Sequence, residues 1–368
     1  MKREKREREG RQGRRPTGRP GRGLRREMLR ACWAVLLPVL LLVLPPLAGS
    51  GRGAAEPLVL TEAQEVELGK KMDQELEKQP GFCGNPELVA YLDQVGQRVA
   101  AQAEPRSFRY TFRILDDDSI NALALPGGYI YVTRGLLAVL NDEAELAAVI
   151  GHEVGHACSR HAAKQLAKAR LFQLLALGAL GAAAASPSTR EHMDAWVVFS
   201  NEFFTQILLG YGRDNELEAD EKGIRFAFQA GYDPRRMCQF LRYLRTKEQL
   251  TGLNFQGFRV THPETAERII KAETLAFVLA RGCEERLEVG RDRFRQHLQG
   301  LPYGPRADRK YLRIYTSKPG DTLCSIATDL LNDPTRAHEI AFLNRMKEDT
   351  PLEPGTLLKI PWDSPHSS

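Results

Sequence analysis

Apolar residues recur at helical spacing in two stretches, EAELAAVI at residues 143–150 and AAKQLAKARL at residues 162–171. Both stretches are also rich in strong helix formers. We therefore predict helical structure on both sides of the segment that separates them. Val149, Ile150 and Val154 are all apolar, so the region around residue 152 is expected to be buried.

Other patterns predict further helices and a few strands. Helix-capping residues precede two apolar-periodic segments, and alternating or β-branched residues mark two strands. The predicted elements are a helix opened by Thr61 and Gln64, a helix at 86–103 capped by Asn85, a strand at 108–115, and a strand at 129–133 after the turn 126–128. We expect an α+β fold that is mostly helical and has a small β-sheet.

The ten residues HEVGHACSRH, 152–161, contain the pattern H-E-x-x-H. His152 and His156 are four residues apart, so on a helix they share a face and can bind one metal ion. Glu153 is one step away, where it can reach a metal-bound water without ligating the metal. Polar groups inside a buried helix need partners, which favours a metal site over a chance match.

A third metal ligand is expected downstream, because a catalytic zinc usually takes three protein ligands. Glu216 and Asp220 are four residues apart on a predicted helix. Glu216 can ligate the metal, and Asp220 can accept a hydrogen bond from a ligand histidine. Glu218 is expected to be solvated. His161 lies five residues after His156, whereas a metzincin site needs a histidine six residues on, so we interpret His161 as a supporting or structural residue.

Four motifs in order carry a resemblance to a known family. They are NALALPGGYIYVTRGLL at 121–137, HEVGHACSRH at 152–161, RDNELEAD at 213–220 and THPETAER at 261–268. Together they resemble the HtpX-like and BepA-like zinc metallopeptidases, which are gluzincins related to the CAAX prenyl proteases and the mitochondrial Oma-type enzymes. The resemblance covers about residues 60–300.

The resemblance implies one zinc ion per chain, bound by His152, His156 and Glu216, with Glu153 as the catalytic base. It also implies that Asp220, Arg213 and Arg268 support the ligands. Glu153 would take a proton from the attacking water and pass it to the leaving amine, so no covalent intermediate is expected.

His262 is a further candidate catalytic residue. It precedes Pro263, which favours an extended backbone, so Thr261 or His262 can simply cap the next helix. The sharper hypothesis is that His262 reaches the zinc site. There it would donate to the oxyanion or occupy the fourth metal position in a resting enzyme.

The strand predicted at 129–133 is a candidate binding site for substrate. If it forms a sheet edge beside the zinc, an extended peptide can pair with Gly128, Tyr129, Ile130 and Tyr131 through backbone hydrogen bonds. Strand propensity alone fits an internal strand equally well. The family resemblance favours the edge.

Residues 311–362 are expected to form a second domain, separated from the first by a linker at 301–310. The motifs PGDTLCSIA, IAFLN and LEPGTLLKIP resemble a LysM domain of order βααβ. Such domains bind peptidoglycan and other N-acetylglucosamine-containing glycans. The resemblance implies a glycan groove that includes Gly320, Asp321, Thr322, Leu323 and Asn344. A spacer or a protein-docking module is the alternative.

Residues 1–50 read as a basic leader followed by a secretory signal, with the apolar run AVLLPVLLLVLPPL at 34–47. Either Met1 or Met28 can be the true start, and an uncleaved anchor is the alternative to cleavage near residue 50. Residues 1–30 carry thirteen basic and four acidic residues, a net +9, whereas the whole chain is +5, so the remainder is −4. The net positive charge of the chain therefore comes from residues 1–30 and gives no argument for nucleic-acid binding.

Residues 57–300 are thus predicted to form an exported zinc endopeptidase domain of the periplasm or cell envelope. Its substrates would be unfolded or misassembled envelope proteins, a family implication. The apolar stretch at 171–185 is expected to be a core helix, with membrane-surface contact as the alternative. Two rival functions remain: an envelope-assembly chaperone with a latent zinc site, and a cell-wall hydrolase.

Overall fold

The computed structural model describes residues 59–105, 108–180, 210–251, 261–262, 266–308 and 310–363. The leader and the segment 181–209 lie outside the described residues. Within the described part of the chain, no helix combines the length and the apolar character needed to cross a membrane.

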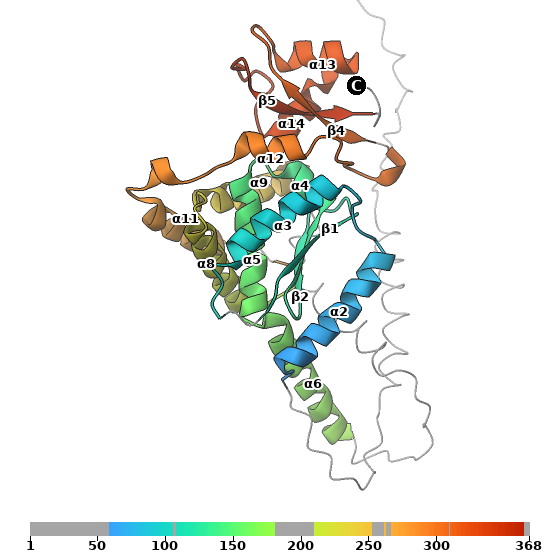
Figure 1. The fold of residues 1–368 in the computed structure, drawn as a ribbon, viewed down its shortest axis with the longest axis vertical. Helices are drawn as coiled ribbons and strands as arrows, with labels where there is room; N and C mark the ends of the chain where they lie inside the picture. Colours follow the sequence, from blue (N-terminus) through green and yellow to red (C-terminus); the bar gives the residue numbers. More distant parts are fainter. Residues whose placement is uncertain are drawn as a thin grey trace, which may run out of the picture. The chain divides into compact units, whose positions relative to one another are not determined.

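The first domain is mostly helical with a three-stranded sheet (Figure 1). Its elements in chain order are α2 Glu62–Lys78, α3 Pro86–Ala100, β1 Thr111–Leu115, β2 Ala122–Leu125, β3 Tyr129–Thr133, α4 Arg134–Val139, α5 Glu143–Cys158, α6 His161–Leu180, α8 Arg213–Gln229, α9 Arg235–Thr251, α11 Ala266–Ala280, η1 Glu284–Arg286 and α12 Arg291–His297.

The predicted helix starts agree with the structure. Thr61 and Gln64 form the capping box of α2, and the Asn85 side chain accepts hydrogen bonds from the first turn of α3. The second strand prediction also agrees, since 129–133 is β3. The first predicted strand is shorter than expected and begins at Thr111.

β3 is the middle strand of the sheet, not an edge. The strand order is β1-β3-β2, with β1 parallel and β2 antiparallel to β3. The prediction that Gly128, Tyr129, Ile130 and Tyr131 offer an edge to substrate is therefore wrong, because β3 pairs along both sides. High strand propensity in YIYVT reflects a buried strand and does not distinguish a centre from an edge.

Helix α5 is the centre of this domain, and all of its residues are buried. It packs most extensively against α8, where glycines allow the two backbones to approach. A Cβ at Gly223 would lie 2.5 Å from the His152 backbone nitrogen, and one at Gly151 would lie 2.7 Å from the Gly223 carbonyl oxygen. No larger residue fits this crossing, which brings the carboxylates of α8 beside the histidines of α5.

The second domain has the predicted βααβ order. η2 Arg306–Asp308 lies in the predicted linker, and the elements of the domain are β4 Tyr311–Thr316, α13 Leu323–Leu331, η3 Pro334–Arg336, α14 Ala337–Asn344 and β5 Leu357–Trp362. β4 and β5 pair antiparallel, from Tyr311 with Trp362 to Thr316 with Leu357. The helices and strands enclose a small apolar core that includes Leu323, Ile340 and Leu358.

The βααβ domain is anchored on the corner between α4 and α5. The fully buried Lys359 ammonium donates to the carbonyls of Ala138 and Leu140, at 2.7 and 2.8 Å. Arg345 donates to the Val139 carbonyl and forms an ion pair with Glu145 at 2.6 Å. These carbonyls end α4 and have no partner within the helix, so the second domain caps this helix.

Replacing Lys359 with alanine is expected to destabilise the whole protein by about 2–5 kcal/mol, because the change leaves a cavity and two buried carbonyls without a donor. Chemical denaturation would measure this loss. Lys318→Ala, at an exposed position of the same domain, should leave the free energy of unfolding within about 0.5 kcal/mol of wild type. Equal stability of both variants would show that the anchoring contributes little.

Candidate metal centre

Four buried side chains from three segments converge on one point. His152 and His156 come from successive turns of α5, Glu216 from the first turn of α8, and His262 from the segment before α11. Each offers one ligand atom, and these atoms lie within 4.8 Å of one another. The structure therefore brings together the three predicted ligands and one further histidine.

The distances suit a single small cation. The Nε2 atoms of His152 and His156 are 3.0 Å apart, and His156 Nε2 lies 3.4 Å from Glu216 Oε1. His262 Nδ1 lies 3.1 Å from His152 Nε2 and 3.2 Å from Glu216 Oε1. Ligands bound tetrahedrally at about 2.0–2.1 Å have neighbouring atoms about 3.3 Å apart, as here. Imidazole and carboxylate are also donors that zinc takes.

Charged partners on α8 and α11 orient two members of this cluster. His152 Nδ1 lies 2.9 Å from Asp220 Oδ1. The fully buried Arg268 donates to both oxygens of Asp220, at 2.6 and 2.7 Å, and forms an ion pair with Glu216 at 2.6 Å. Burial alone would raise the pKa of Asp220, but hydrogen bonds from Arg268 and His152 hold it below its ordinary value. Asp220 and Arg268 thus occupy the supporting positions expected of them.

Glu216 is held as a carboxylate. Burial opposes ionisation, but the charge of His262 and hydrogen bonds from His156 and His262 hold the pKa of Glu216 well below its ordinary value. An ionised carboxylate is the form that binds a cation.

Glu153 lies inside the cluster, where its contact with His262 is an ion pair rather than a hydrogen bond. The side chain is fully buried, and neither carboxylate oxygen has a hydrogen-bond partner among the described residues. The His262 Nε2 atom is 3.3 Å from Glu153 Oε1. Burial raises the pKa of Glu153, against the opposing effect of His262 and His152. A buried acid whose oxygens have no hydrogen bond among the described residues fits a site that receives a water molecule and a metal ion.

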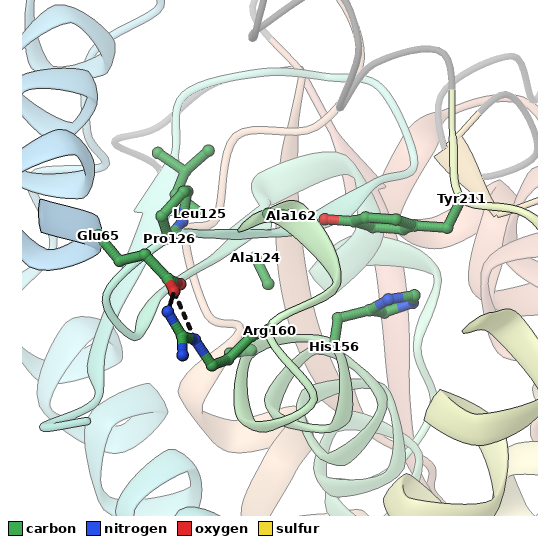
Figure 2. Close-up of a pocket in the computed structure, with 9 residues that line it drawn as sticks. Glu65, Ala124, Leu125, Pro126, His156, Arg160, Ala162 and Tyr211 are labelled. Atoms are coloured by element: carbon green, nitrogen blue, oxygen red, sulfur yellow. Dashed lines mark hydrogen bonds and ion pairs between the residues drawn. The ribbon is translucent and has the colours of Figure 1, made fainter. Parts of the chain in front are cut away.

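A pocket beside His156 adjoins β2, which is an edge strand of the sheet. Figure 2 shows the ring of Tyr211 over that of His156, with the Glu65–Arg160 ion pair on the opposite side of the pocket. The two rings are stacked with centroids 4.2 Å apart. The pocket is further lined by Ala124, Leu125, Pro126, Ala157 and Ala162.

β2 is the strand that borders this pocket. The Thr133 N–H donates to the Asn121 carbonyl, which fixes the antiparallel register of β2 and β3. Alternate residues of an edge strand direct their backbone groups away from the neighbouring strand. In this register the backbone groups of Ala122 and Ala124 are directed away from β3.

Two predictions about α8 need correction. Arg213 lies on the surface with 64% of its side chain exposed and forms an ion pair with Glu267, so it supports no ligand. Glu218 is only partly solvated, because its carboxylate accepts from Ser159 at 2.8 Å and pairs with Lys222 at 2.7 Å. Residue spacing gives the face of a helix but not the partners that other segments supply.

The candidate glycan residues fall into two groups. Gly320 and Thr322 are exposed. Asp321 accepts hydrogen bonds from the Lys318 N–H and the Tyr315 hydroxyl, and Leu323 is in the apolar core. Asn344 is buried, and its amide pairs with the backbone of Ile340 and Lys359. Asp321, Leu323 and Asn344 therefore hold the domain together.

Comparison with known proteins gives matches for both domains. The sequence pattern of peptidase family M48 matches residues 86–276, and that of the LysM domain matches residues 315–361. The chain is 32% identical over 224 residues to the putative beta-barrel assembly-enhancing protease of Vibrio cholerae, covering 59% of this chain and 45% of that protein.

Two other relatives show the same range of similarity. The beta-barrel assembly-enhancing protease of Escherichia coli is 26% identical over 225 residues, which is 61% of this chain and 46% of the relative. The mitochondrial metalloendopeptidase OMA1 of Schizosaccharomyces pombe is 29% identical over 183 residues, 50% of this chain and 51% of the relative. The chain spans about half the length of these curated relatives.

Proposed function

The chain belongs to peptidase family M48, and we propose that it is a zinc-dependent endopeptidase acting on unfolded or misassembled proteins of the cell envelope. The observation that carries this proposal is the convergence of His152, His156 and Glu216 on one point. Glu153 lies beside them, and its oxygens have no hydrogen bond among the described residues. In this proposal these three side chains hold the zinc ion.

When bound, zinc supplies Lewis-acid chemistry and lowers the pKa of a coordinated water to about 7. Glu153 accepts the proton of the attacking water and passes it to the leaving amine. The raised pKa of Glu153 brings this acid closer to the working pH, where a proton acceptor can also become a donor. Arg268 fixes Glu216 and Asp220, so the ligand set is preorganised.

An extended substrate pairs with the edge of β2 in this proposal. The backbone groups of Ala124 and the Ala122 carbonyl are directed away from β3, whereas the Ala122 N–H donates to Asn121 Oδ1. The pocket beside His156 borders the same strand. Recognition through backbone hydrogen bonds gives loose sequence preference, which suits unfolded chains. β2 replaces β3 in this role because β3 is paired on both sides.

Export to the envelope and glycan binding complete the proposal. The leader pattern at 1–50, the LysM match and the relatives named as assembly-enhancing proteases support an envelope protein with peptidoglycan as a second partner. Sedimentation of the purified protein with peptidoglycan sacculi tests the glycan contact.

The peptidase activity is tested with unfolded casein: we expect cleavage that a zinc chelator abolishes and added zinc restores. Cleavage that survives chelation would refute the zinc mechanism.

His262→Ala is expected to increase hydrolysis of small peptides severalfold while zinc stays bound. His262 reaches the ligand atoms of His152 and Glu216, so it can fill a fourth position and favour a resting state. Peptidase assays at saturating zinc would measure this increase in the rate of hydrolysis. A loss of activity without loss of zinc would instead assign His262 to substrate or oxyanion contact, whereas unchanged kinetics would exclude both roles.

A further inference from the structure

His161 is a buried histidine in direct contact with the candidate metal centre. It begins α6, directly after Arg160, whose left-handed conformation (φ 55°) closes the corner between α5 and α6. This corner returns the chain toward α5, so that His161 Nδ1 lies 2.9 Å from His156 Nδ1. The other ring nitrogen of His161 lies 3.3 Å from Glu218 Oε2.

The contact between two Nδ1 atoms fixes where the protons are. A hydrogen bond between them requires that one nitrogen carries a proton and the other does not. His156 directs Nε2 toward the cluster, so its Nδ1 carries the proton when Nε2 binds a cation. His161 Nδ1 must then accept, and its own proton lies on Nε2, facing Glu218.

Glu218 is well placed to accept a hydrogen bond from the Nε2–H of His161. Its carboxylate also accepts from Ser159, and the Lys222 ammonium pairs with it at 2.7 Å. Although burial acts in the opposite direction, the hydrogen bonds from Lys222, Ser159 and His161 lower the pKa of Glu218 to about 2. The hydrogen bonds His156–His161–Glu218 therefore run in one direction and end on a carboxylate.

We propose that His161 is a positioning residue for the metal ligand His156, acting as the acceptor that sets its tautomer and ring orientation. The two ligand histidines are then supported differently. His152 Nδ1 lies directly against the Asp220 carboxylate at 2.9 Å, whereas His156 is linked to a carboxylate through an intervening imidazole. This inference rests on the proposed zinc site. It also gives His161 a role at a spacing, five residues after His156, that does not suit a metal ligand.

Zinc affinity, measured by competition with a chelator of known affinity, tests this role in the full chain. His161→Leu removes the acceptor and should weaken zinc binding about 10–100-fold. His161→Asn places an amide oxygen near the former Nδ1 position and should restore affinity to within about threefold of wild type. If His161 only packed against its neighbours, the zinc affinities of the two variants would not differ in this way.

Glu218→Gln provides a second test at a partly exposed site that a substitution can alter without unfolding the protein. It should weaken zinc binding about 3–10-fold, because the amide can present an N–H to His161 and disfavour the required tautomer. Glu221→Gln, an exposed carboxylate on the same helix, should have no effect. Circular dichroism of each metal-free variant verifies the fold.

The outcomes separate this inference from the proposed function. Wild-type affinity in His161→Leu, or equal weakening in His161→Leu and His161→Asn, would overturn the positioning role while leaving the zinc site intact. A wild-type protein that binds no zinc would overturn both.

Discussion

Glu153→Gln is expected to lower kcat/KM for an unfolded protein substrate by about 10²–10⁴-fold while the zinc content stays at one ion per chain. The glutamine has nearly the same shape but cannot accept a proton, and removal of a general base costs about this much. Glu153 makes no hydrogen bond within the described residues, so its replacement removes only the 3.3 Å ion-pair contact with His262.

The measurement is steady-state cleavage with metal analysis of the same preparation. Glu221→Gln, on the surface of α8, serves as the matched control and should keep full activity. Full activity in Glu153→Gln would mean that another group acts as the base, or that the protein acts as a chaperone with a latent zinc site.

Arg268→Met is expected to destabilise the metal-free protein by about 3–5 kcal/mol. Arg268 is 1% exposed and pairs with both Glu216 and Asp220, so its loss removes a buried guanidinium from two buried carboxylates. Removing one partner of a buried ion pair has a cost of this size, since the remaining charge stays desolvated.

Chemical denaturation in the presence of a chelator measures this effect. Arg213→Met is the matched control, because Arg213 also pairs with a glutamate but is mostly exposed. Exposed ion pairs contribute about 0–1 kcal/mol, so the control should change little. Equal denaturation midpoints for both variants would contradict the role of Arg268 in holding the two carboxylates.

Much of the fold and the family were predictable from local patterns. The capping residues Thr61 and Asn85 begin helices where expected, and the α+β class and the βααβ order of the second domain are confirmed. Family membership confirms the resemblance and agrees with the expected metalloendopeptidase class. These features depend on short-range spacing, which a single sequence displays directly.

Features that depend on contacts between distant segments were not predictable in the same way. The central position of β3 is set by β1 and β2, and nothing within YIYVT reveals it. Lys359 stands in a strand where a lysine normally faces solvent, yet it is fully buried against α4. The close crossing of α5 and α8 could have been suspected from Gly151 and Gly223, whose missing side chains permit it.

The most direct test of the account is the zinc content and zinc affinity of the purified protein, compared with those of Glu216→Ala. We expect one zinc ion per chain in the wild type, and at least about 100-fold weaker binding in the variant, since a whole ligand is lost. A wild type without bound zinc, or a variant with unchanged affinity, would contradict the proposal that Glu216 and the two histidines of α5 form one metal site.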